Sequence, residues 1–154
     1  MNKSDLILYV HGWNSHANAR KAQLIEHELK NHEIFDTASI TLKNHPREAI
    51  EQLTEFISEK QNKYNVHLVG SSLGGYYSVF LAETLNLKAA MINPAVWAYK
   101  IFENDRGGVE NLNTGEKYFI DQAWIDSLED IFIENPTPDR YLVPVSYTHL
   151  TLPT

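Results

Sequence analysis

Two glycines flank a serine at a spacing typical of nucleophilic catalysis. The segment Gly70–Gly74 reads Gly-Ser-Ser-Leu-Gly, with Ser72 at its centre, and it follows an apolar run at 66–69. A helical pattern comes next, so the serine is expected on a sharp strand-to-helix turn where only small neighbours fit. Such a turn presents the hydroxyl at the carboxyl edge of a sheet, near a helix N-terminus that favours negative charge. We predict that Ser72 is a nucleophile and that Ser71 is a spacer.

A glycine-serine segment of this kind has two other interpretations. It can be a plain connection between a strand and a helix, or a glycine-rich loop that binds phosphate. The phosphate-binding loop carries a lysine at a fixed spacing, and residues 70–74 have none. The plain connection stays open until a second motif is considered.

That second motif is His11-Gly12-Trp13, which directly follows the first apolar run, Leu6–Val10. In hydrolases with a serine on such a turn, the loop after an early buried strand supplies one backbone N–H to the oxyanion hole, and the residue after the nucleophile supplies the other. The expected donors are Trp13 and Leu73. His11 precedes the serine in the chain, whereas the histidine base of such enzymes follows it, so His11 is expected to shape the loop through hydrogen bonds.

The pattern of apolar residues predicts strands that alternate with helices. Strands are expected at 6–10, 39–42, 66–69, 89–92 and 141–143, and helices at 19–30, 46–60, 76–85 and 121–131, with a loop at 103–115. Short apolar runs without alternation are typical of strands buried on both faces. The fold class is therefore α/β, a three-layer sandwich with a mostly parallel sheet.

Composition excludes several classes of function. Twenty acidic against 13 basic side chains give a net charge of −7, which disfavours nucleic acid and anionic lipid surfaces as partners. There is no cysteine, and the other histidines lack metal-ligand spacing, so no metal and no cofactor are expected. The apolar run at 6–10 is too short for a signal peptide or a membrane span, which indicates a cytoplasmic protein.

Several ordered motifs together resemble one family. They are Leu8–Ser15, Val69–Tyr77, Ile92–Val96 and Asn113–Tyr118. The chain from about Leu6 to Val143 is similar to the YqiA/YcfP-like bacterial esterases, small members of the α/β-hydrolase superfamily. The resemblance implies hydrolysis of a small acyl ester or thioester by a Ser-His-Asp triad. It assigns the nucleophile to Ser72 and the oxyanion loop to Trp13, with His11, Gly12, Gly70 and Gly74 as supporting residues.

The acid and the histidine of that family's triad are not found in this chain. The acid usually follows the strand expected at 141–143, but the chain continues there into residues 145–154, which resemble a translated sequencing adapter. We expect residues 1–144 to be the N-terminal part of an α/β-hydrolase domain and 145–154 to be a non-native tail. Asp139 precedes the last strand and His149 lies in the tail, so neither is expected to be catalytic.

Three functions are compatible with these residues. The leading one is an esterase whose present chain lacks part of its triad and is nearly inactive. The others are a non-catalytic binding domain that kept the fold, and an acyltransferase in which another nucleophile replaces water. Five aromatic residues are more typical of a core than of an acyl pocket: Trp97, Tyr99, Phe102, Tyr118 and Trp124.

Overall fold

The computed structural model describes residues 2–33 and 35–143. Its centre is a five-stranded sheet with the order β2-β1-β3-β4-β7, and every neighbouring pair is parallel. The strands are β1 (Ser4–Val10), β2 (Phe35–Ser39), β3 (Tyr64–Ser71), β4 (Ala89–Ile92) and β7 (Tyr141–Leu142). A second, two-stranded antiparallel sheet pairs β5 (Gly107–Glu110) with β6 (Lys117–Ile120).

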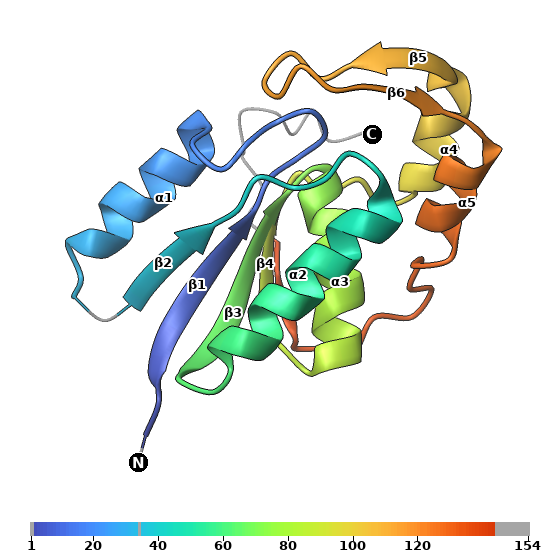
Figure 1. The fold of residues 1–154 in the computed structure, drawn as a ribbon. Helices are drawn as coiled ribbons and strands as arrows, with labels where there is room; N and C mark the ends of the chain where they lie inside the picture. Colours follow the sequence, from blue (N-terminus) through green and yellow to red (C-terminus); the bar gives the residue numbers. More distant parts are fainter. Residues whose placement is uncertain (1, 34, 144–154) are drawn as a thin grey trace, which may run out of the picture.

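Helices cover both faces of the large sheet (Figure 1). Helix α1 (Arg20–Lys30) connects β1 to β2 on one face, whereas α2 (Pro46–Lys60) and α3 (Leu73–Leu85) lie on the other. Crossovers between parallel strands are right-handed, so a change of direction along the sheet changes the face. The chain moves one way along the sheet from β1 to β2 and the other way from β2 to β3 and β4, so α2 and α3 lie on the face opposite α1. The predicted three-layer α/β architecture is therefore confirmed, and ligands of such sheets bind where neighbouring crossovers diverge.

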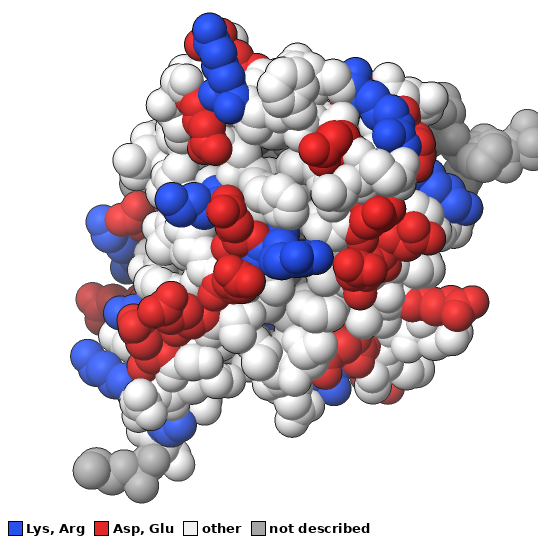
Figure 2. Space-filling model, turned by 45° about the vertical axis from the view of Figure 1, so that its right-hand side comes forward, with Lys and Arg blue, Asp and Glu red and all other residues white. Residues whose placement is uncertain are grey.

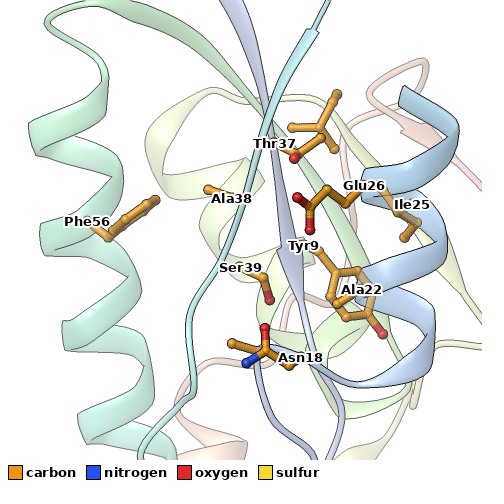
Figure 3. A pocket seen from close by; sticks show the side chains of 11 residues that line it. Tyr9, Asn18, Ala22, Ile25, Glu26, Thr37, Ala38, Ser39 and Phe56 are labelled. Carbon is orange, nitrogen blue, oxygen red and sulfur yellow. The ribbon is translucent and has the colours of Figure 1, made fainter. Parts of the chain in front are cut away.

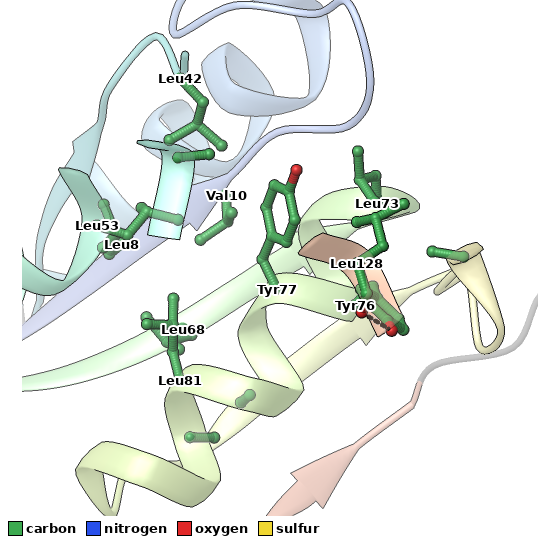
Figure 4. Close-up of a cluster of buried hydrophobic side chains, with 14 of the residues drawn as sticks. Leu8, Val10, Leu42, Leu53, Leu68, Leu73, Tyr76, Tyr77, Leu81 and Leu128 are labelled. Carbon is green, nitrogen blue, oxygen red and sulfur yellow. Dashed lines mark hydrogen bonds between the residues drawn. The ribbon is translucent and has the colours of Figure 1, made fainter. Parts of the chain in front are cut away.

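The main core lies between the sheet and the layer of α2 and α3 (Figure 4). Helix α2 begins with proline at its first position, and the side chain of His45 caps it by accepting a hydrogen bond from the Arg47 amide. Its buried face carries Ala49, Leu53 and Ile57, as the helical spacing predicts. Helix α3 is apolar on most sides, which fits its enclosure by the sheet and its neighbours.

A long excursion between β4 and β7 carries the remaining elements. These are α4 (Ala98–Phe102), a short 3-10 turn (Glu103–Asp105), the β5–β6 hairpin and α5 (Gln122–Glu129). The prediction of a loop over 103–115 is wrong, because β5 lies inside it. Two adjacent glycines at 107 and 108 hide the strand pattern in the sequence, since glycine has low strand propensity. The helix expected at 121–131 is confirmed with slightly shorter bounds.

Two other expected boundaries differ from the structure. The second strand is Phe35–Ser39, so the prediction of 39–42 is wrong for all but its first residue. Strand β2 is a polar edge strand, and the apolar residue Leu42 is instead buried in the following loop. Helix α3 starts at Leu73 and not at 76, because glycines 74 and 75 belong to its first turn, packed against neighbouring backbone and Pro94.

Candidate active site

Ser72 lies between β3 and α3 in a backbone conformation that few residues adopt. Its φ is 53° and its ψ is −116°, outside the left-handed helical region that non-glycine residues sometimes visit. Four backbone hydrogen bonds hold it there. The Ser72 amide donates to Ile92 O at 3.1 Å, and its carbonyl accepts from the amides of Gly75, Tyr76 and Ala95 at 3.0–3.3 Å. The residue is exposed, so its hydroxyl is accessible at the carboxyl edge of the sheet.

The glycines around Ser72 are required by close packing. A Cβ atom at Gly74 would clash with the carbonyl oxygens of Val10 and His11, and one at Gly70 would clash with Gly74 O and the Ser78 hydroxyl. Helix α3 therefore starts directly against the end of β1. This packing is the structural reason for the Gly-x-Ser-x-Gly spacing in the sequence.

The loop after β1 lies beside Ser72. Register pairs Val10 with Gly70, and a Cβ added to Gly12 would lie 3.4 Å from the Ser72 Cβ. Within the described part of the chain, the amides of Trp13 and Leu73 donate no hydrogen bond to the protein. The Leu73 amide belongs to the residue directly after Ser72, and the Trp13 amide belongs to the loop after β1. Such donors can stabilise a negatively charged oxygen.

His11 is buried and both of its ring nitrogens have partners. Nδ1 lies 2.8 Å from Gly12 O, and Nε2 lies 2.9 Å from the amide nitrogen of Leu42. Because a carbonyl accepts and an amide donates, Nδ1 carries the proton and Nε2 is unprotonated. Burial lowers the pKa of His11 below its ordinary value. The neutral ring connects the loop after β1 to the loop after β2.

The β5–β6 hairpin supports the same loop from the other side. The Tyr118 hydroxyl accepts a hydrogen bond from Trp13 Nε1 and donates one to Asn14 Oδ1, both at 2.7 Å. The Asn113 side chain donates to Asn14 O at 2.6 Å, and the Phe102 ring packs edge-on against Trp13 at 5.2 Å. Sequence reasoning singled out 113–118 only through the family resemblance. No local pattern indicates contacts that span about a hundred residues.

No acid or base is placed against Ser72 within residues 2–33 and 35–143, and its hydroxyl makes no hydrogen bond there. His67 on β3 and Asp5 on β1 lie 2.8 Å apart, but His67 is five residues before Ser72, roughly 16 Å away along the strand. Asp139 precedes β7 at the opposite edge of the sheet, as the sequence analysis predicts, and lines a cavity there together with Lys88. His149 lies outside the described residues, as does the predicted tail.

Residues near the carboxyl ends of the strands contribute to the walls of three cavities. One of about 20 Å³, room for one water molecule, lies behind the loop after β1 and is lined by His11, Leu73, Asn111 and the buried Tyr77. Burial raises the pKa of Tyr77. A second, of about 310 Å³, lies between α1 and β2 (Figure 3) and is lined by Tyr9, Asn18, Glu26 and Ser39, among others.

The third cavity, of about 360 Å³, is mainly apolar and starts at Pro94 and Ala95, directly after β4. Trp97, which is half exposed, and Tyr76 contribute to its walls. The other aromatic residues from the sequence analysis have different places. Phe102 and Trp124 are buried in the core; Tyr118 stacks on Trp124. Tyr99 and Tyr118 are partly buried and pack against the core. Four of the five aromatic residues therefore belong to the core or pack on it, and Trp97 lines the apolar cavity.

The surface chemistry of the described residues adds little to the site. Acidic and basic side chains are interspersed on the face in Figure 2, without a broad basic area. Among residues 2–33 and 35–143, no three His, Asp or Glu side chains gather as a metal site would require. In that same part of the chain, none of the helices has the length and apolarity needed to cross a membrane.

A family profile matches nearly the whole chain. The family is described as "Uncharacterised protein family (UPF0227)", and the match covers residues 6–148. The chain belongs to this family, which is the YqiA/YcfP-like family that the sequence motifs resemble.

Solved structures with the same fold are α/β-hydrolases. Est1E from Butyrivibrio proteoclasticus, determined with bound ferulic acid, superposes with a TM-score of 0.62 at 16% identity, over 84% of this chain and 61% of that one. Alpha/beta hydrolase domain-containing protein 10 from mouse gives 0.60 at 18% identity, over 86% and 64%. A monoacylglycerol lipase from Paleococcus ferrophilus gives 0.57 at 17% identity, over 84% and 68%. The fold is that of the α/β-hydrolases, and the chain spans less than two thirds of the length of the first two structures.

Proposed function

We propose that this protein is a serine hydrolase that cleaves acyl esters or thioesters through an acyl-enzyme on Ser72. The observation that carries the proposal is the conformation of Ser72. An exposed serine at φ 53°, fixed by four backbone hydrogen bonds between a strand and a helix, has no evident structural purpose. Backbone strain of this kind clusters at active sites, where the surrounding structure maintains it.

The proposed reaction uses the groups around that serine. The Ser72 oxygen attacks the acyl carbonyl and gives its proton to a base, while the amides of Trp13 and Leu73 stabilise the oxyanion. Collapse of the tetrahedral intermediate expels the alcohol or thiol, which takes up the proton. Water then attacks the acyl-enzyme in the same way and releases the acid. The apolar cavity that begins at Ala95, whose amide bonds to Ser72 O, offers room for the acyl group.

The base and its acid are proposed to follow Pro144 in the full-length protein. His11 is unsuited to the role because both its nitrogens are engaged. His67 lies far from Ser72 along β3. We therefore expect the 154-residue chain to hydrolyse esters very slowly.

Labelling with a serine-directed fluorophosphonate tests the proposal. In a longer chain that continues through the genomic sequence after Pro144, peptide mass mapping should locate the label on Ser72, and Ser72→Ala should abolish it. Ser71→Ala is the matched control, because Ser71 is the adjacent serine but is buried. Labelling that persists in Ser72→Ala refutes the assignment. A longer chain that lacks both labelling and esterase activity favours the non-catalytic binding domain.

A further inference from the structure

The β5–β6 hairpin makes contacts that the proposed reaction does not yet use. The Tyr118 hydroxyl accepts a hydrogen bond from Trp13 Nε1–H and donates one to Asn14 Oδ1. An indole nitrogen only donates, so the tyrosine proton must point to the asparagine. One hydroxyl thereby joins the side chains of two consecutive residues in the loop after β1. We propose that Tyr118 is a positioning residue for the oxyanion hole, acting through Trp13 and Asn14; this rests on the proposed function.

The loop needs such a support because its own backbone is unusual. Asn14 has a φ of 53°, and inside the loop Ser15 N–H bonds to Gly12 O at 3.2 Å. On one side the loop is tied by His11 to Leu42. On the other, the ties are Tyr118 and Asn113 of the hairpin. The proposed donor amide, that of Trp13, lies between these two sets of ties.

The hairpin is itself firmly anchored, so it can transmit order to the loop. Its turn is organised by Asn111, which is 2% exposed and whose side chain donates to Asn44 Oδ1 at 2.7 Å. The Tyr118 ring stacks on Trp124, at 6.5 Å and 23° between planes. Trp124 is fully buried, and its indole donates to Asn44 O at 3.1 Å. The hydroxyl of Tyr118 is therefore held at a fixed place relative to the core.

The chemistry of the hydroxyl suits a constant support. Burial raises the pKa of Tyr118, so the group stays protonated and keeps donating through the neutral range. A misplacement of about 1 Å in a catalytic group can lower a rate by about a hundredfold. Because the oxyanion forms only on the way through the transition state, loss of the Tyr118 hydroxyl should reduce turnover and leave substrate affinity nearly unchanged.

Tyr118→Phe is the decisive variant, because it keeps the stacked ring and removes only the hydroxyl. In the longer, active chain we expect kcat to fall by about 10- to 100-fold, with KM within about twofold. Tyr64→Phe is the matched control: its hydroxyl bonds to Asp36 at the other end of the sheet, and its kinetics should equal those of the parent. A raised KM with unchanged kcat would mean substrate contact instead of positioning and would overturn the proposal.

A structural readout separates this proposal from the proposed function. In the 154-residue chain, the indole N–H resonance of Trp13, assigned with Trp13→Phe, should move in Tyr118→Phe while that of Trp97 stays. An unmoved Trp13 resonance contradicts the hydrogen bond, whatever the kinetics. Asn14→Gly is a second route that keeps the positive φ and removes the acceptor; kcat should fall as in Tyr118→Phe, and full activity would refute the mechanism. Full activity in Ser72→Ala would instead refute the proposed function.

Discussion

The strained backbone at Ser72 should be measurable as stability lost for the sake of the site. Replacing Ser72 by glycine removes the Cβ atom that makes a φ of 53° with a ψ of −116° unfavourable. Replacing it by alanine removes the same hydroxyl but keeps the Cβ. The difference between Ser72→Gly and Ser72→Ala therefore isolates the strain from the loss of the nucleophile.

The expected size follows from two opposing contributions. A non-glycine residue in such a region costs about 1–3 kcal/mol. Glycine loses more backbone entropy on folding, which costs about 0.5–1 kcal/mol. The four backbone hydrogen bonds that hold residue 72 do not involve its side chain, so both variants keep them. Ser72→Gly should then be more stable than Ser72→Ala by about 1 kcal/mol, or about 2–4 °C in Tm for a chain of this length.

Urea denaturation followed by tryptophan fluorescence gives the two free energies of unfolding, and thermal melts give an independent ranking. Equal m values in the two variants show that the unfolded state is unchanged. If Ser72→Gly is equal to or less stable than Ser72→Ala, residue 72 is not strained, and the observation that carries the proposed function loses its force.

Three further results are expected. Gly74→Ala should destabilise the fold by about 3 kcal/mol in urea titrations, because the added Cβ meets rigid backbone. Gly108→Ala, whose added Cβ makes only ordinary contacts, should change stability by less than about 1 kcal/mol, and equal effects of the two variants would contradict the packing argument. Burial lowers the pKa of His11, so the unfolded chain binds this proton before the folded chain does as pH falls. The free energy of unfolding should therefore decline below about pH 6.5, with a slope of at most about 1.4 kcal/mol per pH unit. His11→Gln should remove this slope and His32→Gln, at an exposed histidine, should retain it; a slope unchanged in His11→Gln would refute the account. A chain continued past Pro144 should hydrolyse p-nitrophenyl esters on the order of 10⁶-fold faster than the present one, and comparable rates would show that a base within these 154 residues works.

The sheet was predictable because its strands are short apolar runs with glycine or asparagine after them. Strand β4 matches its predicted bounds. Strand β1 begins two residues before its predicted run, and β3 extends its predicted run by two residues at both ends. Strand β2 was not predictable in the same way, because an edge strand has few buried positions and Phe35–Ser39 contains only two apolar residues. The predicted strand was placed too late because it included Leu42, an apolar residue that is buried by tertiary contacts in the loop after β2.

The candidate site was predictable to the extent that it is local. The Gly-x-Ser-x-Gly spacing records the approach of α3 to β1, which any sequence must satisfy with glycine at 70 and 74. The role of Tyr118 follows from contacts with residues more than a hundred positions away, and such contacts leave no periodic signal. The β5 strand was missed because two of its four residues are glycines, while its turn is organised by hydrogen bonds of the Asn111 side chain.

The hydrogen bonds between the loop after β1 and the β5–β6 hairpin can form only late in biosynthesis. Trp13 leaves the ribosome 105 residues before Tyr118, which at about 5–20 residues per second is an interval of about 5–20 s. During that time the sheet can form from β1 to β4, but the indole of Trp13 and the backbone of Asn14 have no partner from the hairpin. The growing chain therefore carries an assembled turn at Ser72 beside an unsupported loop. A nascent chain arrested before residue 118 should expose Trp13 to chaperones that recognise aromatic side chains.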